Sequence, residues 1–571
     1  MFSKKLFLYL IVITVIVSSC NNLGNNKEER LINRFNKKGD KYFKEGVKDK
    51  NNYAIAIDFY NKAAVLNDPY AESKLGDIYN EGYGVKINYQ DAVKWYKKAA
   101  DQNYAEAQYK LGEMFFEGHG VDRDYNMALN WYNKAAQQNY SDAFTDIGVC
   151  YLSGYGVEID YKEAVEWYRK GAEQGNKRAK RNLGIMYENG LGVEQDYNEA
   201  VKLYSEAAEQ NNASAQYLLG NMYKRGLGVE QDYKEAFKWF RKAAIQNEEH
   251  AQLNLGIMYF EGNGISQDYK EAYKWYEKAA KQNNASAQNN LGNMYYKGLG
   301  VEQDYNEALK WYNKAAIQNN AFAQFSLGVM YAEGIGVNKD YNEAFKWYLK
   351  AAEQDHSGAQ NNLGSLYYDG NGVNKDYNEA LKWYSKAAEQ GEIMAIRNLA
   401  MMYYNGNGVN KDYTMAFDLY MKAAEGGDNI AQNIIGLMYY KGEGINKDYE
   451  QCFIWCKKSA EQNNEEAQKN LGVFYEDGIG VKQDYKKAVE WYRKAAEKGN
   501  NIAIWRLGYM YEYGLSVEQD YTKAFELYKK AAELNHQGAQ RSLAFLYENG
   551  YGVPKDQNQA NFWYRKSREN K

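Results

Sequence analysis

The side chains best suited to acid–base or metal chemistry are scarce in this sequence. Its 571 residues include only four histidines, His119, His250, His356 and His536. No two of them are three or four residues apart, the spacing at which side chains share one face of a helix and could bind one metal ion. We therefore expect no histidine metal site and no cofactor.

The cysteines and carboxylates also favour packing over chemistry. Cys452 and Cys456 are four residues apart and would lie on one helix face, but two thiols of one continuous helix do not readily reach disulfide geometry. Cys150 falls at an apolar position. The carboxylates recur at fixed intervals, and no nucleophile, base and orienting group form a set. The sequence predicts that the chain is not an enzyme.

Paired glycines before a helix are a third candidate for chemistry, because phosphate-binding loops contain them. Gly370 and Gly372 precede a helical stretch at residues 379–390. A phosphate loop needs a preceding strand and free backbone amides where the next helix begins. Here an apparent helix over residues 359–368 comes first, and Asp376 stands where the second helix begins. The glycines are therefore expected to turn a corner.

The elements that position these residues repeat along most of the chain. A Leu-Gly pair or its equivalent recurs every 36 residues from Leu75-Gly76 to Leu543-Ala544, which gives fourteen units without an insertion. Each unit contains two stretches with apolar residues at helical spacing, which we call helix A and helix B. In the unit around Gly370 that glycine is expected to end helix A in the left-handed conformation. Asp376 is predicted to cap helix B, with Glu379 completing a capping box.

The repeated pattern A-x-x-x-L-G-x-x-Y-x-x-G-x-G-V-x-x-D-Y-x-x-A-x-x-W-Y-x-K-A-A closely resembles the Sel1-like repeat, a relative of the tetratricopeptide repeats. The resemblance covers residues 69–571 and implies an all-α fold, a right-handed αα-superhelix (solenoid) of about fourteen 36-residue helix pairs. Residues 31–68 are expected to form a degenerate leading pair whose loop is one residue longer. Ala400, Ala544 and the pair Leu515-Ser516 depart from the pattern, which puts local turn geometry in doubt but not the fold.

The N-terminus is predicted to be a targeting segment. Two lysines precede an apolar run, and Val17-Ser18-Ser19-Cys20 resembles the lipobox of bacterial lipoproteins. That resemblance implies a signal peptide at residues 1–19, lipidation of Cys20 and a polar tether at residues 20–30. The protein would then be anchored in a bacterial cell envelope, with the outer membrane favoured, on its periplasmic face or at the cell surface. The net charge of −4 gives no reason to expect nucleic acid as a partner.

The resemblance also implies a concave surface, lined mainly by helix A, that holds a protein or peptide partner. One position of helix A carries asparagines, whose amides could hydrogen-bond an extended peptide backbone: Asn182, Asn254, Asn290, Asn362, Asn398 and Asn470. The position before it varies in the manner of a recognition surface, with Tyr109, Tyr217, Phe325, Arg397 and Trp505 among its residues. A solvated helix surface in an asparagine-rich chain would explain the same pattern.

The sequence thus favours a lipid-anchored scaffold that binds a protein or peptide along helix A. Two alternatives stay open. One is an envelope enzyme that acts on peptidoglycan or a β-lactam, and the other is a structural spacer without a specific ligand.

Overall fold

The computed structural model describes residues 27–569, so Cys20 and the predicted signal peptide lie outside the described residues. Every regular element between residues 27 and 569 is a helix, and none of these helices combines the length and apolar character needed to cross a membrane. Residues 27–46 are helical and include residues 27–30, which the sequence analysis assigned to the tether. The predicted all-α solenoid of repeated helix pairs is confirmed.

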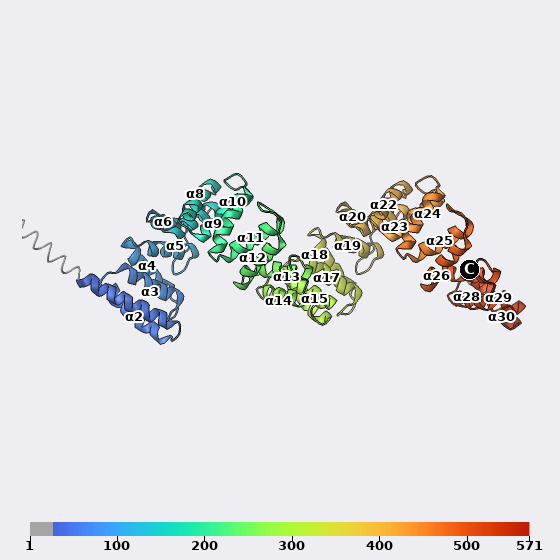
Figure 1. Ribbon diagram of the computed structural model, residues 1–571, viewed down its shortest axis with the longest axis horizontal. Coiled ribbons are helices and arrows are strands. Elements are labelled where there is room, and N and C mark those ends of the chain that lie inside the picture. The colour runs from blue at the N-terminus through green and yellow to red at the C-terminus, as the bar shows by residue number, and fades with distance from the viewer. Residues whose placement is uncertain (1–26, 570–571) are drawn as a thin grey trace, which may run out of the picture. The chain divides into compact units, whose positions relative to one another are not determined.

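The chain divides between Asn284 and Ala285 into two compact units. Within each unit, every helix packs against the helices before and after it in the chain (Figure 1). In the first unit helix A is represented by α3 (Pro69–Glu81), α5 (Ala105–Glu117), α7 (Ser141–Ser153), α9 (Lys177–Asn189), α11 (Ala213–Arg225) and α13 (Glu249–Glu261). Helix B is represented by α2 (Asn51–Ala64), α4 (Tyr89–Asp101), α6 (Tyr125–Gln137), α8 (Tyr161–Glu173), α10 (Tyr197–Glu209), α12 (Tyr233–Ile245) and α14 (Tyr269–Lys281).

The second unit continues the same alternation. Helix A is represented by α15 (Ala285–Lys297), α17 (Ala321–Glu333), α19 (Ser357–Asp369), α21 (Ile393–Asn405), α23 (Asn429–Lys441), α25 (Glu465–Asp477), α27 (Asn501–Tyr513) and α29 (Gln537–Asn549). Helix B is represented by α16 (Tyr305–Ile317), α18 (Tyr341–Ala352), α20 (Tyr377–Glu389), α22 (Tyr413–Glu425), α24 (Tyr449–Glu461), α26 (Tyr485–Glu497), α28 (Tyr521–Glu533) and α30 (Gln557–Glu569).

The two glycines of the Gly-x-Gly turn have different structural roles. Gly370 ends α19 with φ 78°, and its N–H donates to the Leu366 carbonyl, as the sequence predicted. Gly372 has φ 70°, and a Cβ at this residue would collide with the carbonyl oxygen of Tyr341, the first residue of the preceding helix B. The second glycine therefore permits close approach between successive repeats as well as a turn. At the departure from this pattern, Ser516 keeps the left-handed conformation with φ 54°, so the turn survives.

The start of helix B is capped by one side chain instead of two. The Asp376 carboxylate accepts hydrogen bonds from the backbone N–H groups of Asn378 and Glu379 at 2.8 and 3.1 Å, which confirms the predicted N-cap. The reciprocal half of the capping box was wrong. The Asp376 N–H donates to the Tyr367 carbonyl at 2.9 Å, and the Glu379 carboxylate pairs with Lys382 at 3.0 Å. The backbone of the turn already satisfies the donor that Glu379 would have served.

The core of most repeats is built by a tyrosine of helix B whose ring packs against a glycine of helix A. A Cβ added at Gly364 would come within 2.8 Å of the Tyr384 ring, which is almost fully buried. The Tyr384 hydroxyl donates to the Ser365 hydroxyl at 3.0 Å. The alanines of helix B, such as Ala380 and Ala387, are fully buried beside it. A side chain on the glycine would push the two helices apart. This contact therefore explains why the Leu-Gly pair recurs in the sequence.

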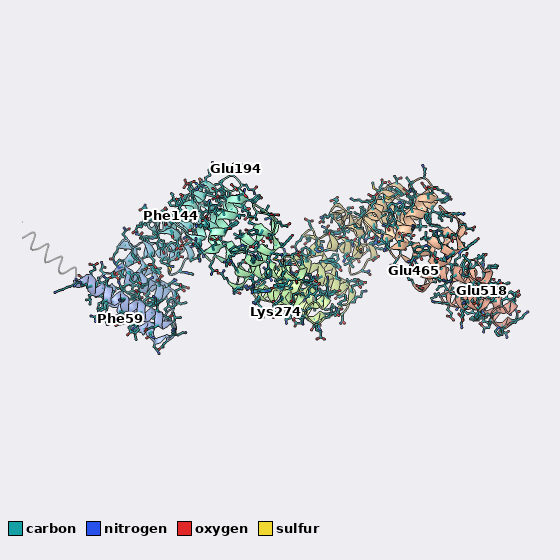
Figure 2. All side chains as sticks on the ribbon, in the orientation of Figure 1. Phe59, Phe144, Glu194, Lys274, Glu465 and Glu518 are labelled. Atoms are coloured by element: carbon teal, nitrogen blue, oxygen red, sulfur yellow. The ribbon has the colours of Figure 1, made fainter. Side chains whose placement is uncertain are left out.

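A buried glutamine joins successive repeats. The Gln360 side chain of α19 donates to the Ala352 carbonyl of α18 at 3.1 Å and accepts from the Gln390 side chain after α20 at 2.8 Å. The same relay recurs at Gln216, Gln324 and Gln432. In α7 the relay is absent because Phe144, labelled in Figure 2, takes the glutamine position and packs on Trp167 with ring centroids 5.9 Å apart.

The leading pair differs from its prediction. Its helices are joined by residues 47–50, a shorter connection than residues 82–88 of the next repeat, and not a longer one. The first helix runs on through Gly46, which lacks the positive φ of the other C-cap glycines and lies against the Tyr53 ring. Without the Gly-x-Gly pair, nothing ends this helix early, so the extra residue lengthens helices instead of the loop.

Candidate partner-binding surface

The six predicted asparagines lie buried or half-buried on helix A, and two of them donate hydrogen bonds to the preceding repeat. The Asn398 amide donates to the Asn361 side-chain oxygen at 2.9 Å, and the Asn470 amide donates to the Asn433 side-chain oxygen at 3.0 Å. In both cases the donor and acceptor come from successive helices A. At these two positions the amide row therefore stabilises the solenoid itself.

The other four asparagines have partners on their own helix, and Asn254 also has one on the preceding helix A. Asn182 accepts from the Arg181 guanidinium, Asn254 accepts from Lys224 and donates to the His250 carbonyl, and Asn290 and Asn362 accept from Asn289 and Asn361. Each side chain amide keeps capacity for one further bond, because an amide has two donors and two acceptor lone pairs. Their binding of a partner's backbone stays a prediction.

The neighbouring variable position lies at the seam between successive helices A. In four of the five residues the side chain contacts the residue that caps the next helix A. The pairs are Tyr109 with Tyr140 and Phe325 with His356 (ring centroids 5.1 and 4.6 Å apart), Trp505 with His536 (5.0 Å), and Arg397 with Asp428 (Nη1 to Oδ2, 2.8 Å). Tyr217 lies against His250 with ring centroids 5.7 Å apart.

The variation at this position therefore has a structural explanation that sequence analysis did not weigh. Tyr109 is only 4% exposed, and its hydroxyl lies between the Asp146 and Glu113 carboxylates, at 2.7 and 3.0 Å, and can donate its proton to either. It is too enclosed to meet a partner, and we leave it out of the candidate surface. The other four side chains are partly exposed at the edges of their seams, and their role in recognition stays a prediction.

A different position of helix A was missed. The second residue of four helices A in the second unit is a large apolar side chain exposed to solvent: Phe322 (64%), Met394 (48%), Ile430 (44%) and Ile502 (36%). Whole repeats separate these residues, so they occupy equivalent places on α17, α21, α23 and α27. In the first unit the same position holds polar residues such as Glu106, Asp142 and Arg178. An alignment of the repeats would have revealed this row, as large apolar residues at a position of helix A that is polar in most other repeats.

The titratable residues are engaged in structure. His356 and His536 cap α19 and α29 by accepting, through Nδ1, the backbone N–H groups of Ala359 and Ala539 at 3.2 and 3.0 Å. Burial raises the pKa of the Cys150 thiol to about 12, which leaves it protonated and a poor nucleophile. Among residues 27–569, no three His, Cys, Asp or Glu side chains are grouped so that they could hold a metal ion.

The buried thiols behave as small apolar side chains. Cys452 and Cys456 are fully buried in α24, as predicted, at positions where most repeats have alanine and tyrosine. Within the described part of the chain Cys150, Cys452 and Cys456 are free. The Cys456 sulfur occupies the place above Gly436 where a tyrosine ring lies in other repeats.

Comparisons with known proteins agree with this architecture. The Sel1 repeat matches fifteen consecutive segments, including the degenerate leading pair: residues 39–68, 69–104, 105–140, 143–176, 177–212, 213–248, 249–284, 285–320, 321–356, 357–392, 393–428, 429–464, 465–500, 501–536 and 538–571. No match was found among curated proteins.

Two solved structures illustrate the relationship. The crystal structure of c5321, a protective antigen of uropathogenic Escherichia coli strains with an SLR fold, is 36% identical, with a TM-score of 0.67, and the match covers 80% of this chain and 97% of that one. A Sel1 repeat protein from Oxalobacter formigenes is 39% identical over 43% of this chain and 96% of its own, with a TM-score of 0.41. The repeat matches span most of the sequence, and the chain therefore belongs to the Sel1 repeat family.

Proposed function

We propose that this protein is a lipid-anchored scaffold that binds a protein partner along helix A of its second unit. The observation that carries the proposal is the row formed by Phe322, Met394, Ile430 and Ile502, which we call the apolar row. Full burial of such a side chain is worth about 1.5–3 kcal/mol. Four of them at equivalent places offer a partner a repeated hydrophobic anchor.

A polar group suited to a peptide backbone lies beside the apolar row in one repeat. Asn398 lies four residues beyond Met394 on α21, whereas Asn362 and Asn470 lie on α19 and α25, which have Gly358 and Glu466 at the position of the apolar row. Residues three or four apart on a helix lie on the same face. An amide beside the Met394 anchor would combine affinity with fixed orientation at that repeat, which supports a peptide or extended segment as the ligand there.

Anchoring through Cys20 is the second part of the proposal. The small residues before this cysteine and the apolar run before them support cleavage and lipidation. The Escherichia coli relative is a protective antigen, and exposure of this chain in the bacterial envelope would agree with such a property. Replacement of Cys20 by alanine should move the protein from the detergent phase to the aqueous phase in a detergent partition experiment. Equal partition of both forms would contradict the anchor.

The binding part is tested by crosslinking capture from envelope extract with residues 21–571. The test variant carries Phe322→Ser, Met394→Ser, Ile430→Ser and Ile502→Ser. The control carries four serines at exposed apolar residues away from this row: Ile87, Ile159, Ile245 and Ile317. A protein that the parent and the control capture and the test variant loses would support the proposal.

The other outcomes separate the alternatives. Equal capture by all three forms would place the binding site elsewhere. No capture by any form would favour a spacer without a specific ligand. Turnover of peptidoglycan fragments or a β-lactam by the parent would instead support an envelope enzyme.

A further inference from the structure

The first repeats of the chain enclose a polar hollow that the apolar row does not involve. Its volume is about 630 Å³, and its walls come from the helix at residues 27–46 and from α2, α3, α4 and α5. Four carboxylates line it, those of Asp40, Asp77, Glu81 and Glu106. A hollow of this size is in the range of ligand sites.

Asp40 is held in a fixed orientation with one oxygen left free. The hydroxyls of Tyr60 and Tyr70 both donate to its Oδ1 atom, at 2.8 and 2.7 Å. No hydrogen-bond donor among residues 27–569 reaches Oδ2, and no lysine, arginine or histidine in that range forms an ion pair with Asp40. Burial, followed by the hydrogen bond to Asp40, raises the pKa of both tyrosines far above the usual value, so they remain donors. The free oxygen is thus preorganised to accept from something else.

The remaining charges leave the hollow negative. Lys74 is shared between Asp77 and Glu106, with Nζ to oxygen distances of 3.0 and 3.1 Å. The Glu81 carboxylate accepts only from the Asn80 amide and has no ion-pair partner in the described chain. Lys44 also lines the hollow, and Lys110, at its edge, pairs with Glu113 outside it. The four carboxylates of the hollow are therefore opposed, among the described residues, by only two lysines, Lys44 and Lys74, because Lys110 pairs with a residue outside it.

The wall beside these carboxylates is aromatic. Phe43 and Tyr83 line the hollow in an edge-to-face arrangement, with ring centroids 5.1 Å apart. Aromatic faces attract a guanidinium or ammonium group, and arginine is the more frequent partner. Carboxylates and rings together suit a cationic side chain with an apolar stem. A bare metal ion does not fit, because no group of three suitable ligands occurs among residues 27–569.

We propose that this hollow is a second docking site, which receives an arginine or lysine side chain of a protein partner through Asp40 and Glu81. The inference rests on the proposed scaffold function only in that the cation belongs to a protein. It adds a charge requirement at the N-terminal end of the array to the hydrophobic requirement in the second unit. Attraction at this site would be screened by salt, since Glu81 is exposed.

The test measures binding of a fluorescent Gly-Arg-Arg-Gly peptide to the full mature chain by anisotropy. The matched probe has citrulline in place of both arginines, which keeps the shape and removes the charge. The test variant is Asp40→Asn with Glu81→Gln, and the control is Asp49→Asn with Asp58→Asn, which removes the same charge from the exposed outer surface of the leading pair. The amide oxygen introduced by Asp40→Asn would still accept from both tyrosines, and Glu81→Gln alone serves if the double variant melts early.

We expect the arginine peptide to bind the parent and the control equally and the test variant about tenfold more weakly. The citrulline peptide should bind the parent as weakly as the arginine peptide binds the test variant. Three results would overturn the inference. The first is that the parent binds the arginine and citrulline peptides equally, the second is that the test variant binds the arginine peptide as tightly as the parent does, and the third is that the parent binds neither peptide. The serine variant of the apolar row should bind the arginine peptide normally, so failure here is distinguishable from failure of partner capture.

Discussion

Acidification should loosen the first turns of α19 and α29, because a neutral histidine caps each of them. The Nδ1 atoms of His356 and His536 accept backbone N–H groups at 3.2 and 3.0 Å, and a protonated imidazole has no lone pair with which to accept. Burial lowers the pKa of both side chains, with the Arg506 charge adding to the effect at His536. Each helix should therefore be destabilised by protonation.

The sign and size of the effect follow from the cap. Because the folded-state pKa lies below the unfolded value of about 6.5, the contribution to stability is present above about pH 6.5 and is lost as the pH falls through the lowered folded value. Loss of an N-cap costs about 1 kcal/mol. A positive charge at a helix N-terminus adds about 0.5 kcal/mol. We expect a loss of about 1.5 kcal/mol at each helix, or about 3 kcal/mol for both.

The assay compares the parent with the double variant His356→Asn and His536→Asn. Asparagine caps other helices A of this chain, for example Asn320 before α17, and it does not titrate in this range. Amide hydrogen exchange of residues 357–360 and 537–540 would be measured at pH 7.5 and 5.0 and corrected for the intrinsic pH dependence. Carboxylates that become protonated at pH 5.0 are common to both proteins, so their effect on protection cancels in the comparison. If protection in the parent and in the asparagine variant falls equally on acidification, the assignment of the caps is wrong.

Two further predictions concern the contacts between and within repeats. Gln324→Ile should lower the free energy of unfolding by about 1 kcal/mol, because it removes one of the two donors to the Ala316 carbonyl, which keeps the Asn319 N–H, and takes the acceptor away from the Gln354 amide. The double variant Gln324→Ile with Gln354→Leu, which copies the natural pair Ile504 and Leu534, should recover part of the loss in urea denaturation, and a cycle of these two substitutions without coupling would contradict the relay. Gly292→Ala should cost about 1–3 kcal/mol of stability, since the new Cβ would lie 2.5 Å from the Tyr312 ring. The control is Gly391→Asn, which meets no atom at its Cβ within 4 Å and copies Asn319, a residue with the same left-handed backbone; equal shifts of the melting temperature for the two variants would refute this packing argument.

The repeated parts of the fold could be predicted because their causes are local. Asp376 caps the helix that immediately follows it, and Gly370 ends the helix that immediately precedes it. The capping box failed at Glu379 because a backbone carbonyl of the preceding helix, that of Tyr367, had already taken the Asp376 N–H. That competition is set by the geometry of the turn, which the residue pattern does not contain.

The candidate sites were harder to predict because they depend on contacts between repeats. The variable position of helix A was predicted to be a recognition surface, yet Phe325 and Arg397 lie against the caps of the next helix. The free oxygen of Asp40 depends on the packing of Tyr60 and Tyr70 from two different helices. The apolar row at Phe322 was visible in the sequence only after its exposure was known.

The seams between helices A restrict how such a chain can change in length. Four of the five seams described above join a residue to a partner 31 positions later, for example Phe325 to His356 and Trp505 to His536. Excision of residues 326–505 from the coding sequence would leave whole repeats and set Phe325 against His536, again an aromatic ring on an imidazole. Excision of residues 326–397 would preserve the period equally well but would set Phe325 against Asp428, a carboxylate. Recombination between near-identical repeats therefore preserves these contacts only where the new neighbours match, so the order of the repeats matters to the seams as well as their number.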